Sequence, residues 1–476
     1  MFINPSDTLD KKKITMAKLQ HKVNALYHHL GKQGLYVNTN NDIFIGPYQT
    51  LTTGKGKKYT FHLLKDQGIA YASPMLFAAL TAMLNHGTML FTGAASVGKT
   101  TSAYLAGHFF NGQEYEDIRS ATIHGHSRQT EERTIARYHT GRLLQGEEHV
   151  LWRKFAKSNV KVVNEFNRFG PDILNIFLDF VDTGYLNYGD EYLETKPGPL
   201  FATMNYNDSG TRDVQEPMLD RFDIAVPVTS PQPWDLENIL KRSDEKLNGG
   251  FKDLLAIPPD IKLSDEERLQ IRQEIASLPL HEDVEDFRTF AVATVRYSEV
   301  ASDSVERMTK GNAWTMQDTS QLHFQNHPSL YTENEITLRT ARNLDRYSKA
   351  IAWLTESTVA TMEHLKVVFP YVTWHKLKPT TKSLGTSKFA NDRIQFGKML
   401  FDEIQKDWVA LKTKEQLTTY LDVKVSLENP SFSHPDLLNL TTKAMEQICT
   451  LDHPLAPVLA KHLESLYNAR MSNVRT

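Results

Sequence analysis

The chain has 476 residues, of which 40% are hydrophobic and 23% are charged, and its formal net charge is −3. This composition is typical of globular proteins and excludes the intrinsically disordered class. The near-neutral charge, with a pI of about 6.7, provides no overall basic field for a nucleic acid. We expect a cytoplasmic protein, because the single cysteine, Cys449, cannot form an internal disulfide, and neither a membrane span nor an export signal is recognisable.

Residues 1–70 are expected to form an N-terminal extension. Its pattern predicts a helix over 17–30 and short β-rich segments around 43–45 and 59–64. Between these segments, the polar, glycine-containing stretch 53–58 predicts a turn, because glycine adopts backbone angles that other residues avoid.

Residues 71–230 alternate between apolar segments of strand length and helical patterns, beginning with a helix at 73–85. The expected strands are Thr88–Thr92, Ala121–His124, Val160–Asn164, Leu200–Met204 and Asp223–Val228. This alternation predicts an α/β core in which a parallel sheet lies between helices. One break in the pattern, 185–193, places Gly189-Asp190 between aromatic and branched residues and predicts a β-hairpin.

Beyond Pro231 the pattern is helical, and we expect an all-α lid over 231–378 followed by an α-helical C-terminal extension over 379–476. A polar stretch at about 301–333 is expected to be a loop insertion in the lid, and 379–389 a linker. The expected helices of the lid are 264–277, 283–297, 338–353 and 362–377.

The chemistry is expected at the phosphate-loop pattern Gly-x4-Gly-Lys-Thr between the first strand and a helix. The loop amides and the helix N-terminus would bind the phosphates of ATP, Lys99 would reach the β- and γ-phosphates, and the Thr100 hydroxyl would ligate Mg²⁺. The expected nucleotide-binding residues are Gly93, Ala94, Ala95, Ser96, Val97, Gly98, Lys99, Thr100 and Thr101.

The third strand ends in Asn164-Glu165, the Walker B position. Glu165 is the candidate for polarising the attacking water, whereas Asn164 stands where an Asp usually helps to hold Mg²⁺. We expect Thr100 and Asn164 at the metal, with reduced Mg²⁺ affinity because an amide carries no charge. The alternative is a degenerate site that binds nucleotide without hydrolysing it.

Two further polar residues follow the remaining strands of the core. Asn205 comes directly after the fourth strand and can orient the lytic water. Arg221 precedes the fifth strand and is a candidate arginine finger. The pair His124 and His126 lacks further ligands at metal-binding spacing, which favours a strand-end position over a metal site.

In this order, the motifs resemble the MoxR branch of the AAA+ ATPases, within the helix-2-insert group. The resemblance covers roughly residues 70–378 and rests on Asn164–Arg168, Ala202–Asn205, Leu219–Phe222, Thr337–Thr340 and Val368–Leu377, after the phosphate loop. Asn164 and the insertion at 301–333 depart from the family pattern.

The resemblance implies a P-loop AAA+ core and a role for each site residue. Glu165 would be the catalytic carboxylate, Asn205 sensor 1 and Arg339 sensor 2 in the lid. Arg221 would act in trans on the neighbouring subunit, which implies a homo-oligomeric ring, usually a hexamer. Hairpins within 126–155 and at 185–193 would line the ring face or pore.

The leading hypothesis is therefore a Mg²⁺-dependent ring ATPase that remodels or activates a protein partner. The resemblance implies that this partner could carry a von Willebrand factor type A domain. A nucleic-acid motor is the first alternative, disfavoured by the charge balance and the lack of a basic, aromatic-interleaved stripe. A nucleotide-gated assembly scaffold with weak hydrolysis is the second, because of Asn164.

Overall fold

The computed structural model describes residues 5–33, 44–52, 58–65, 73–205, 214–230, 233, 237, 239–241, 251–313, 323–386, 392–429 and 434–474. Within these ranges the chain forms two compact units, each described here by itself. The first comprises Met1–His281 with Arg342–Val372, and the second comprises Glu282–Ala341 with Thr373–Thr476. The domain boundaries expected from the sequence stay a prediction.

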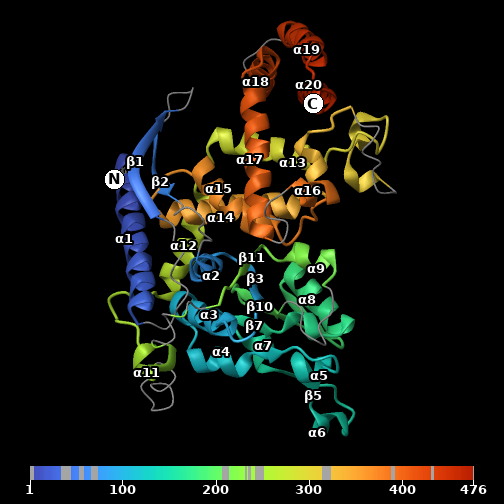
Figure 1. The fold of residues 1–476 in the computed structure, drawn as a ribbon. Coiled ribbons are helices and arrows are strands. Elements are labelled where there is room, and N and C mark those ends of the chain that lie inside the picture. Colours follow the sequence, from blue (N-terminus) through green and yellow to red (C-terminus); the bar gives the residue numbers. More distant parts are fainter. Residues whose placement is uncertain are drawn as a thin grey trace. The chain divides into compact units, whose positions relative to one another are not determined.

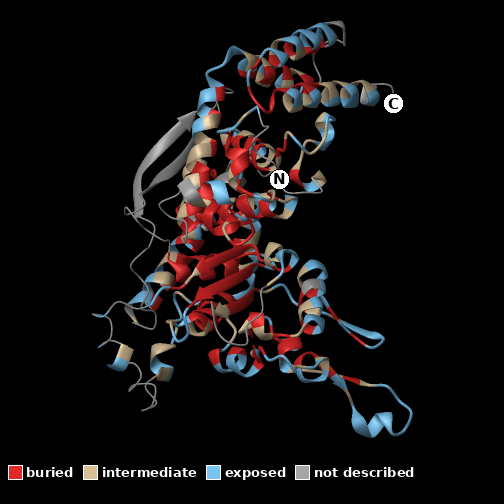
Figure 2. Ribbon diagram, turned by 45° about the vertical axis from the view of Figure 1, so that its right-hand side comes forward, coloured by how far each residue is buried: buried red, intermediate tan, exposed pale blue. Residues whose placement is uncertain are grey.

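A five-stranded parallel sheet forms the core of the first unit, in the order β11-β3-β10-β7-β4. Its strands are β3 (Thr88–Gly93), β4 (Ile123–His124), β7 (Lys161–Asn164), β10 (Leu200–Asn205) and β11 (Ile224–Pro227). All five expected strands are confirmed to within a few residues. β3 and β10 are buried along most of their length, as the red strands of Figure 2 show, which explains their nearly continuous apolar sequences.

The strand register brings the expected polar positions to one edge of this sheet. Asn205 is the cross-strand partner of Gly93, and Asn164 is the partner of His124. Because the strands are parallel, their carboxyl ends meet at the same edge, where α/β folds bind ligands.

Helices cover both faces of the sheet, with α2 to α4 on one side and α8 and α9 on the other (Figure 1). The helices of this core are α2 (Pro74–Met83), α3 (Lys99–Ala106), α4 (Tyr115–Ala121), α5 (Glu131–Thr134), α6 (Thr140–Leu143), α7 (Lys154–Lys157), α8 (Pro171–Thr183) and α9 (Glu216–Arg221). α2 is buried at every position, which accounts for its largely apolar sequence, and its one polar side chain, Thr81, donates a hydrogen bond to the Phe77 carbonyl oxygen.

Two antiparallel hairpins interrupt the α/β order; the resemblance implied the first and the residue pattern predicted the second. The first pairs β5 (Ala136–Tyr138) with β6 (Val150–Trp152) and carries α6 at its end. The second pairs β8 (Tyr185–Tyr188) with β9 (Glu191–Glu194) around Gly189, whose positive φ of 57° suits a tight turn. Both project from the core in Figure 2.

The N-terminal helix α1 (Pro5–Lys32) is longer than the expected 17–30, and proline at its start suits the first turn of a helix. It buries a stripe at helical spacing, formed by Leu19, Val23, Leu26 and Leu30. β1 (Phe44–Thr52) and β2 (Lys58–Lys65) pair antiparallel at the two expected β-rich segments, and β1 is longer than the expected 43–45. Residues 53–57 of the expected turn lie outside the described residues.

The first unit also contains α11 (Phe251–Leu254), α12 (Asp265–Ser277), most of α14 (Leu338–Leu354) and most of α15 (Met362–Thr373). Arg346 connects α14 to the parallel sheet. Its Nη1 lies 2.8 Å from Oδ2 of the buried Asp223, and the same oxygen accepts a hydrogen bond from the main-chain N–H of Thr88. These contacts therefore connect α14 to the N-terminal ends of β3 and β11.

The second unit is largely helical. It contains α13 (Glu282–Arg296), α16 (Thr381–Thr386), α17 (Arg393–Lys412), α18 (Glu415–Glu428), α19 (His434–Cys449) and α20 (Ala456–Val474). Within the expected insertion, the described residues form short 3-10 turns at Val305–Arg307, Lys310–Asn312 and Pro328–Tyr331, while 314–322 lie outside the described residues. The expected α/β core followed by a largely helical region is confirmed.

The segment 379–389 was expected to be a linker, and this is wrong for its first part, where α16 forms. Thr380 explains the helix, because its Oγ1 accepts a hydrogen bond from the main-chain N–H of Ser383 and so caps the first turn. The Ser and Thr residues that suggested a linker are also those that favour helix N-caps. Residues 387–391 lie outside the described residues.

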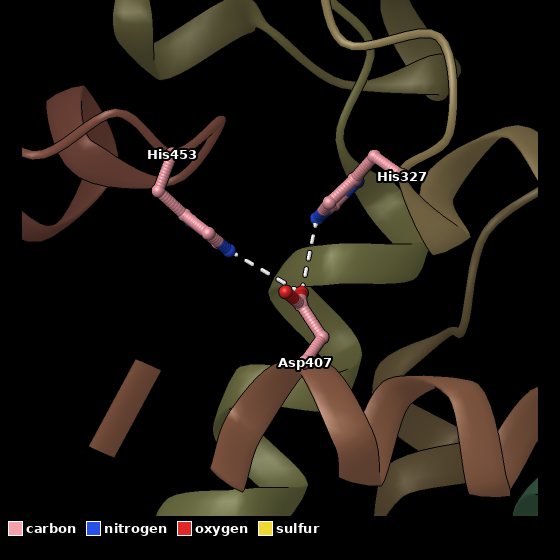
Figure 3. A group of neighbouring side chains, drawn as sticks. All are labelled: His327, Asp407 and His453. Atoms are coloured by element: carbon pink, nitrogen blue, oxygen red, sulfur yellow. Dashed lines mark hydrogen bonds and ion pairs between the residues drawn. The ribbon is translucent and has the colours of Figure 1, made fainter. Parts of the chain in front are cut away.

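A partly buried cluster of side chains joins three distant segments of the second unit (Figure 3). Nε2 of His327 and Nε2 of His453 each lie 3.3 Å from Oδ2 of Asp407. Both histidines precede a proline, and each Nδ1 accepts a main-chain N–H two residues on, from Ser329 and Leu455. Each Nε2 therefore carries the proton and faces Asp407. A metal ion bound to Nε2 would require the opposite tautomer, so the geometry fits a hydrogen-bonded clamp.

Replacing Asp407 by alanine is expected to destabilise the second unit by about 2–4 kcal/mol, because two buried imidazoles lose their shared acceptor. Burial alone would raise the pKa of Asp407, but the hydrogen bonds from His327 and His453 outweigh it and hold this pKa well below its usual value. The stabilisation is thus fully present above about pH 4 and lost as the pH falls further.

Thermal unfolding of the variant, with the exposed Glu446→Ala as control, checks this expectation. The clamp predicts a lower melting temperature for Asp407→Ala only, and no effect of EDTA on the wild type. A large EDTA-induced destabilisation would instead indicate a bound metal.

Candidate nucleotide-binding site

The phosphate-loop motif forms a tight loop between β3 and α3, and its glycines are required by the backbone. Gly93 and Gly98 have φ angles of +144° and +89°, in the region that favours glycine. A Cβ at Gly93 would lie 2.4 Å from the carbonyl oxygen of Val228, so a side chain cannot fit there. Ser96 also has a positive φ, of 61°. Such a loop before a helix N-terminus presents main-chain N–H groups to an anion.

Lys99 begins α3 and folds back across the loop. Its ammonium donates to the carbonyl oxygens of Gly93, at 3.0 Å, and Ala94, and to Oδ1 of Asn205, at 2.8 Å. These three acceptors use all three ammonium protons. Burial lowers the pKa of Lys99, and the Glu165 carboxylate partly offsets this effect. The Lys99 side chain is therefore already positioned, and the oxygens of a bound phosphate would take the place of some of these acceptors.

Thr100 and Asn164 meet between α3 and β7. The Thr100 hydroxyl donates to Oδ1 of Asn164 at 2.8 Å, and the Thr203 hydroxyl of β10 donates to the same oxygen. The amide nitrogen of Asn164 lies 3.2 Å from Nδ1 of His124. Because the Thr100 proton points to Asn164, the lone pairs of its oxygen remain for a cation. The two residues expected at Mg²⁺ therefore fit such a role.

Glu165 follows β7 in an unusual conformation, with a φ of +53°. Non-glycine residues in this region carry strain of about 1–3 kcal/mol and cluster at functional sites. The Thr203 hydroxyl accepts the Glu165 N–H at 3.0 Å. Gly125 packs against the Glu165 main chain, and a Cβ at Gly125 would lie 2.0 Å from the Glu165 carbonyl oxygen. The side chain pairs with Arg168, 3.2 Å away, and remains partly exposed.

Asn205 ends β10 beside the loop. Its side-chain oxygen contacts Lys99, and its main-chain oxygen accepts a hydrogen bond from Nδ2 of Asn167 at 3.1 Å. The structure thus gathers Lys99, Thr100, Asn164, Glu165 and Asn205 at one edge of the sheet. Thr101 follows Thr100 in the first turn of α3, partly exposed.

The two predicted arginines come from α9 and α14. Arg221, at the end of α9, is bound within its own subunit, with Nη2 2.8 Å from Oδ2 of Asp182 and Nη1 2.8 Å from the Pro217 carbonyl oxygen. Arg339 lies in the first turn of α14 and belongs to the second compact unit. The roles of both arginines stay predictions.

Two contacts of the site were not assigned from the sequence. Thr203 lies two residues before Asn205, so the two side chains share a strand face, and this alternation could have indicated it. His124 was expected only at a strand end; its contact with Asn164 depends on the pairing of β4 with β7, which nothing in the sequence specifies.

Comparisons with known proteins agree with this geometry. Residues 88–222 match the family model described as the AAA domain of the dynein-related subfamily, so the chain contains an AAA domain. A crystal structure from Cytophaga hutchinsonii, described provisionally as an ATPase, is similar with a TM-score of 0.58 and 16% sequence identity, over 83% of this chain and 98% of that chain. This likeness shows that the two chains share a fold. No curated protein matches the sequence.

Proposed function

We propose that the chain is a Mg²⁺-dependent ATPase that works as a ring and remodels or activates a protein partner, as MoxR proteins do. One observation carries the hydrolytic part. The ammonium of Lys99, the hydroxyl of Thr100, the carboxylate of Glu165 and the amide of Asn205 lie at one edge of the sheet, beside an anion-binding loop.

In this proposal each residue of the site has a separate role. Lys99 binds the β- and γ-phosphates, while Thr100 and Asn164 hold Mg²⁺, which when bound neutralises charge on the phosphate oxygens. Glu165 accepts a proton from the attacking water, and Asn205 orients that water. The preformed position of Lys99, held by three acceptors, supports its part in phosphate binding.

A protein partner is supported by the exposed apolar side chains of the two hairpins. Leu144, beside α6, is 85% exposed, and Tyr192 in β9 is 70% exposed. Contiguous exposed apolar groups mark interaction sites, and each of these side chains has an exposed apolar neighbour: Leu143 precedes Leu144, and the ring of Tyr185 contacts that of Tyr192. We assign these hairpins to substrate contact; a von Willebrand factor type A domain remains the partner suggested by the resemblance.

A homo-oligomeric ring, usually a hexamer in the resembled family, is supported by the AAA domain itself, since such domains usually assemble into rings. Arg221 and Arg339 are the proposed finger and sensor 2. Within the described residues no helix combines the length and apolar character that a membrane crossing needs. The single cysteine is the basis for placing the protein in the cytoplasm.

Mixing two inactive variants is expected to restore activity if Arg221 acts in trans. In a 1:1 mixture of Lys99→Ala and Arg221→Ala subunits, about a quarter of the interfaces in a head-to-tail ring combine an intact loop with an intact finger. We therefore expect phosphate release at up to about a quarter of the wild-type rate.

Lys99→Ala mixed with Glu165→Gln provides the control. These residues belong to the same site, so no arrangement of subunits restores both, and the mixture should stay inactive. Equal inactivity of both mixtures would contradict the trans role of Arg221.

Asn164 supports a second candidate, a nucleotide-gated scaffold with weak hydrolysis, because an amide lacks the charge of the usual carboxylate. The two candidate functions differ in the expected rate of ATP hydrolysis. Mg²⁺-dependent phosphate release supports the ATPase, and tight nucleotide binding without release supports the scaffold.

A further inference from the structure

The side-chain amide of Asn164 has two possible orientations that differ chemically, whereas the two orientations of the usual Asp carboxylate are equivalent. A carboxylate presents two equivalent acceptor oxygens, whereas an amide presents one acceptor and one donor. Thr100 and Thr203 both approach one end of this amide. A hydroxyl can donate or accept, so these two neighbours fit the amide in either orientation.

The orientation decides whether Thr100 can serve as a ligand. With Oδ1 toward Thr100, the hydroxyl donates its proton to Asn164 and keeps its lone pairs available. With Nδ2 in that place, the amide would donate to Thr100 Oγ1, occupy a lone pair and turn the hydroxyl proton outward. A cation would then meet a proton instead of an oxygen lone pair.

The third neighbour of the amide is His124, at the end of β4. It is the cross-strand partner of Asn164, and its Nδ1 lies 3.2 Å from Nδ2. An imidazole nitrogen without a proton accepts and cannot donate, so it selects the amide nitrogen. Nε2 then carries the proton, which its exposed position allows.

We infer that His124 is a positioning residue that fixes the Asn164 amide with its oxygen toward Thr100, so that His124 and Asn164 together replace the Walker B Asp. This inference rests on the proposed Mg²⁺-nucleotide site. It does not depend on hydrolysis, because its consequence is the affinity for Mg²⁺ in the nucleotide complex.

The test measures binding of a fluorescent ATP analogue to the full chain as Mg²⁺ is titrated, at about pH 8, above the ordinary titration range of imidazole. Removing a group that orients a ligand typically weakens metal binding 10–100-fold, so we expect His124→Ala to raise the half-saturating Mg²⁺ concentration by about tenfold. His124→Gln keeps an acceptor and should stay within about threefold of the wild type. His126→Ala, a nearby exposed histidine whose Nδ1 accepts from the N–H of Arg128, is the matched control and should be unchanged.

The Asn164→Asp background separates orientation from structural damage. A carboxylate needs no orientation, so His124→Ala should not change the Mg²⁺ requirement in that background. A loss of similar size in both backgrounds, or no effect of His124→Ala in the wild type, would overturn the inference. Absence of ATP hydrolysis alongside the expected binding pattern would refute only the proposed ATPase activity.

Discussion

Replacing Lys99 by alanine is expected to weaken ATP binding by about a hundredfold or more and to abolish hydrolysis. Each hydrogen bond between a charged group and a phosphate is worth about 1.5–3 kcal/mol, and Lys99 would make more than one. The ammonium is buried beside the loop and lies 2.8 Å from Asn205, so its loss removes the positive charge from this position. The effect should therefore appear in affinity as well as in turnover.

Equilibrium binding of a fluorescent ATP analogue and steady-state phosphate release measure the two effects. Lys157→Ala, an exposed lysine at the end of α7, is the matched control and should resemble the wild type. Unchanged ATP affinity in the folded Lys99→Ala protein would mean that the loop does not bind the phosphates.

Replacing Glu165 by glutamine is expected to reduce hydrolysis by about 10²–10⁴-fold, the usual contribution of a general base, while ATP binding stays within about threefold. The amide keeps the shape of the side chain but cannot take a proton from water. The backbone of Glu165 is held by Thr203 and Gly125, so the substitution should leave its unusual φ unchanged.

Phosphate release and nucleotide affinity, measured on the same preparation, separate these effects. Glu147→Gln changes an exposed glutamate near the first hairpin tip and should have no effect. If Glu165→Gln kept more than about a tenth of wild-type turnover, another group would have to be the base.

The parts of the site that are contiguous in sequence were predictable. The phosphate loop needs only local spacing, and the glycines at its two ends meet backbone requirements that the motif itself encodes. Asn205 was found because the carboxyl ends of parallel strands share one edge. The helical region was also predictable, since apolar residues repeat at helical spacing in α12 to α15.

Contacts between distant segments were not predictable. Asn164 and His124 are forty residues apart, and only the register of β4 on β7 makes them neighbours. The pair of Arg346 with Asp223 joins residues 123 positions apart, and His327, Asp407 and His453 come from three separate segments. Such contacts depend on packing, because each residue alone is compatible with an exposed position.

Phosphate release from ATP by the purified full chain, with Mg²⁺ and with excess EDTA, tests the central claim most directly. The account predicts continuous turnover that requires Mg²⁺ and that disappears in Glu165→Gln. A wild-type rate equal to that of Glu165→Gln, or a rate that EDTA leaves unchanged, would contradict it.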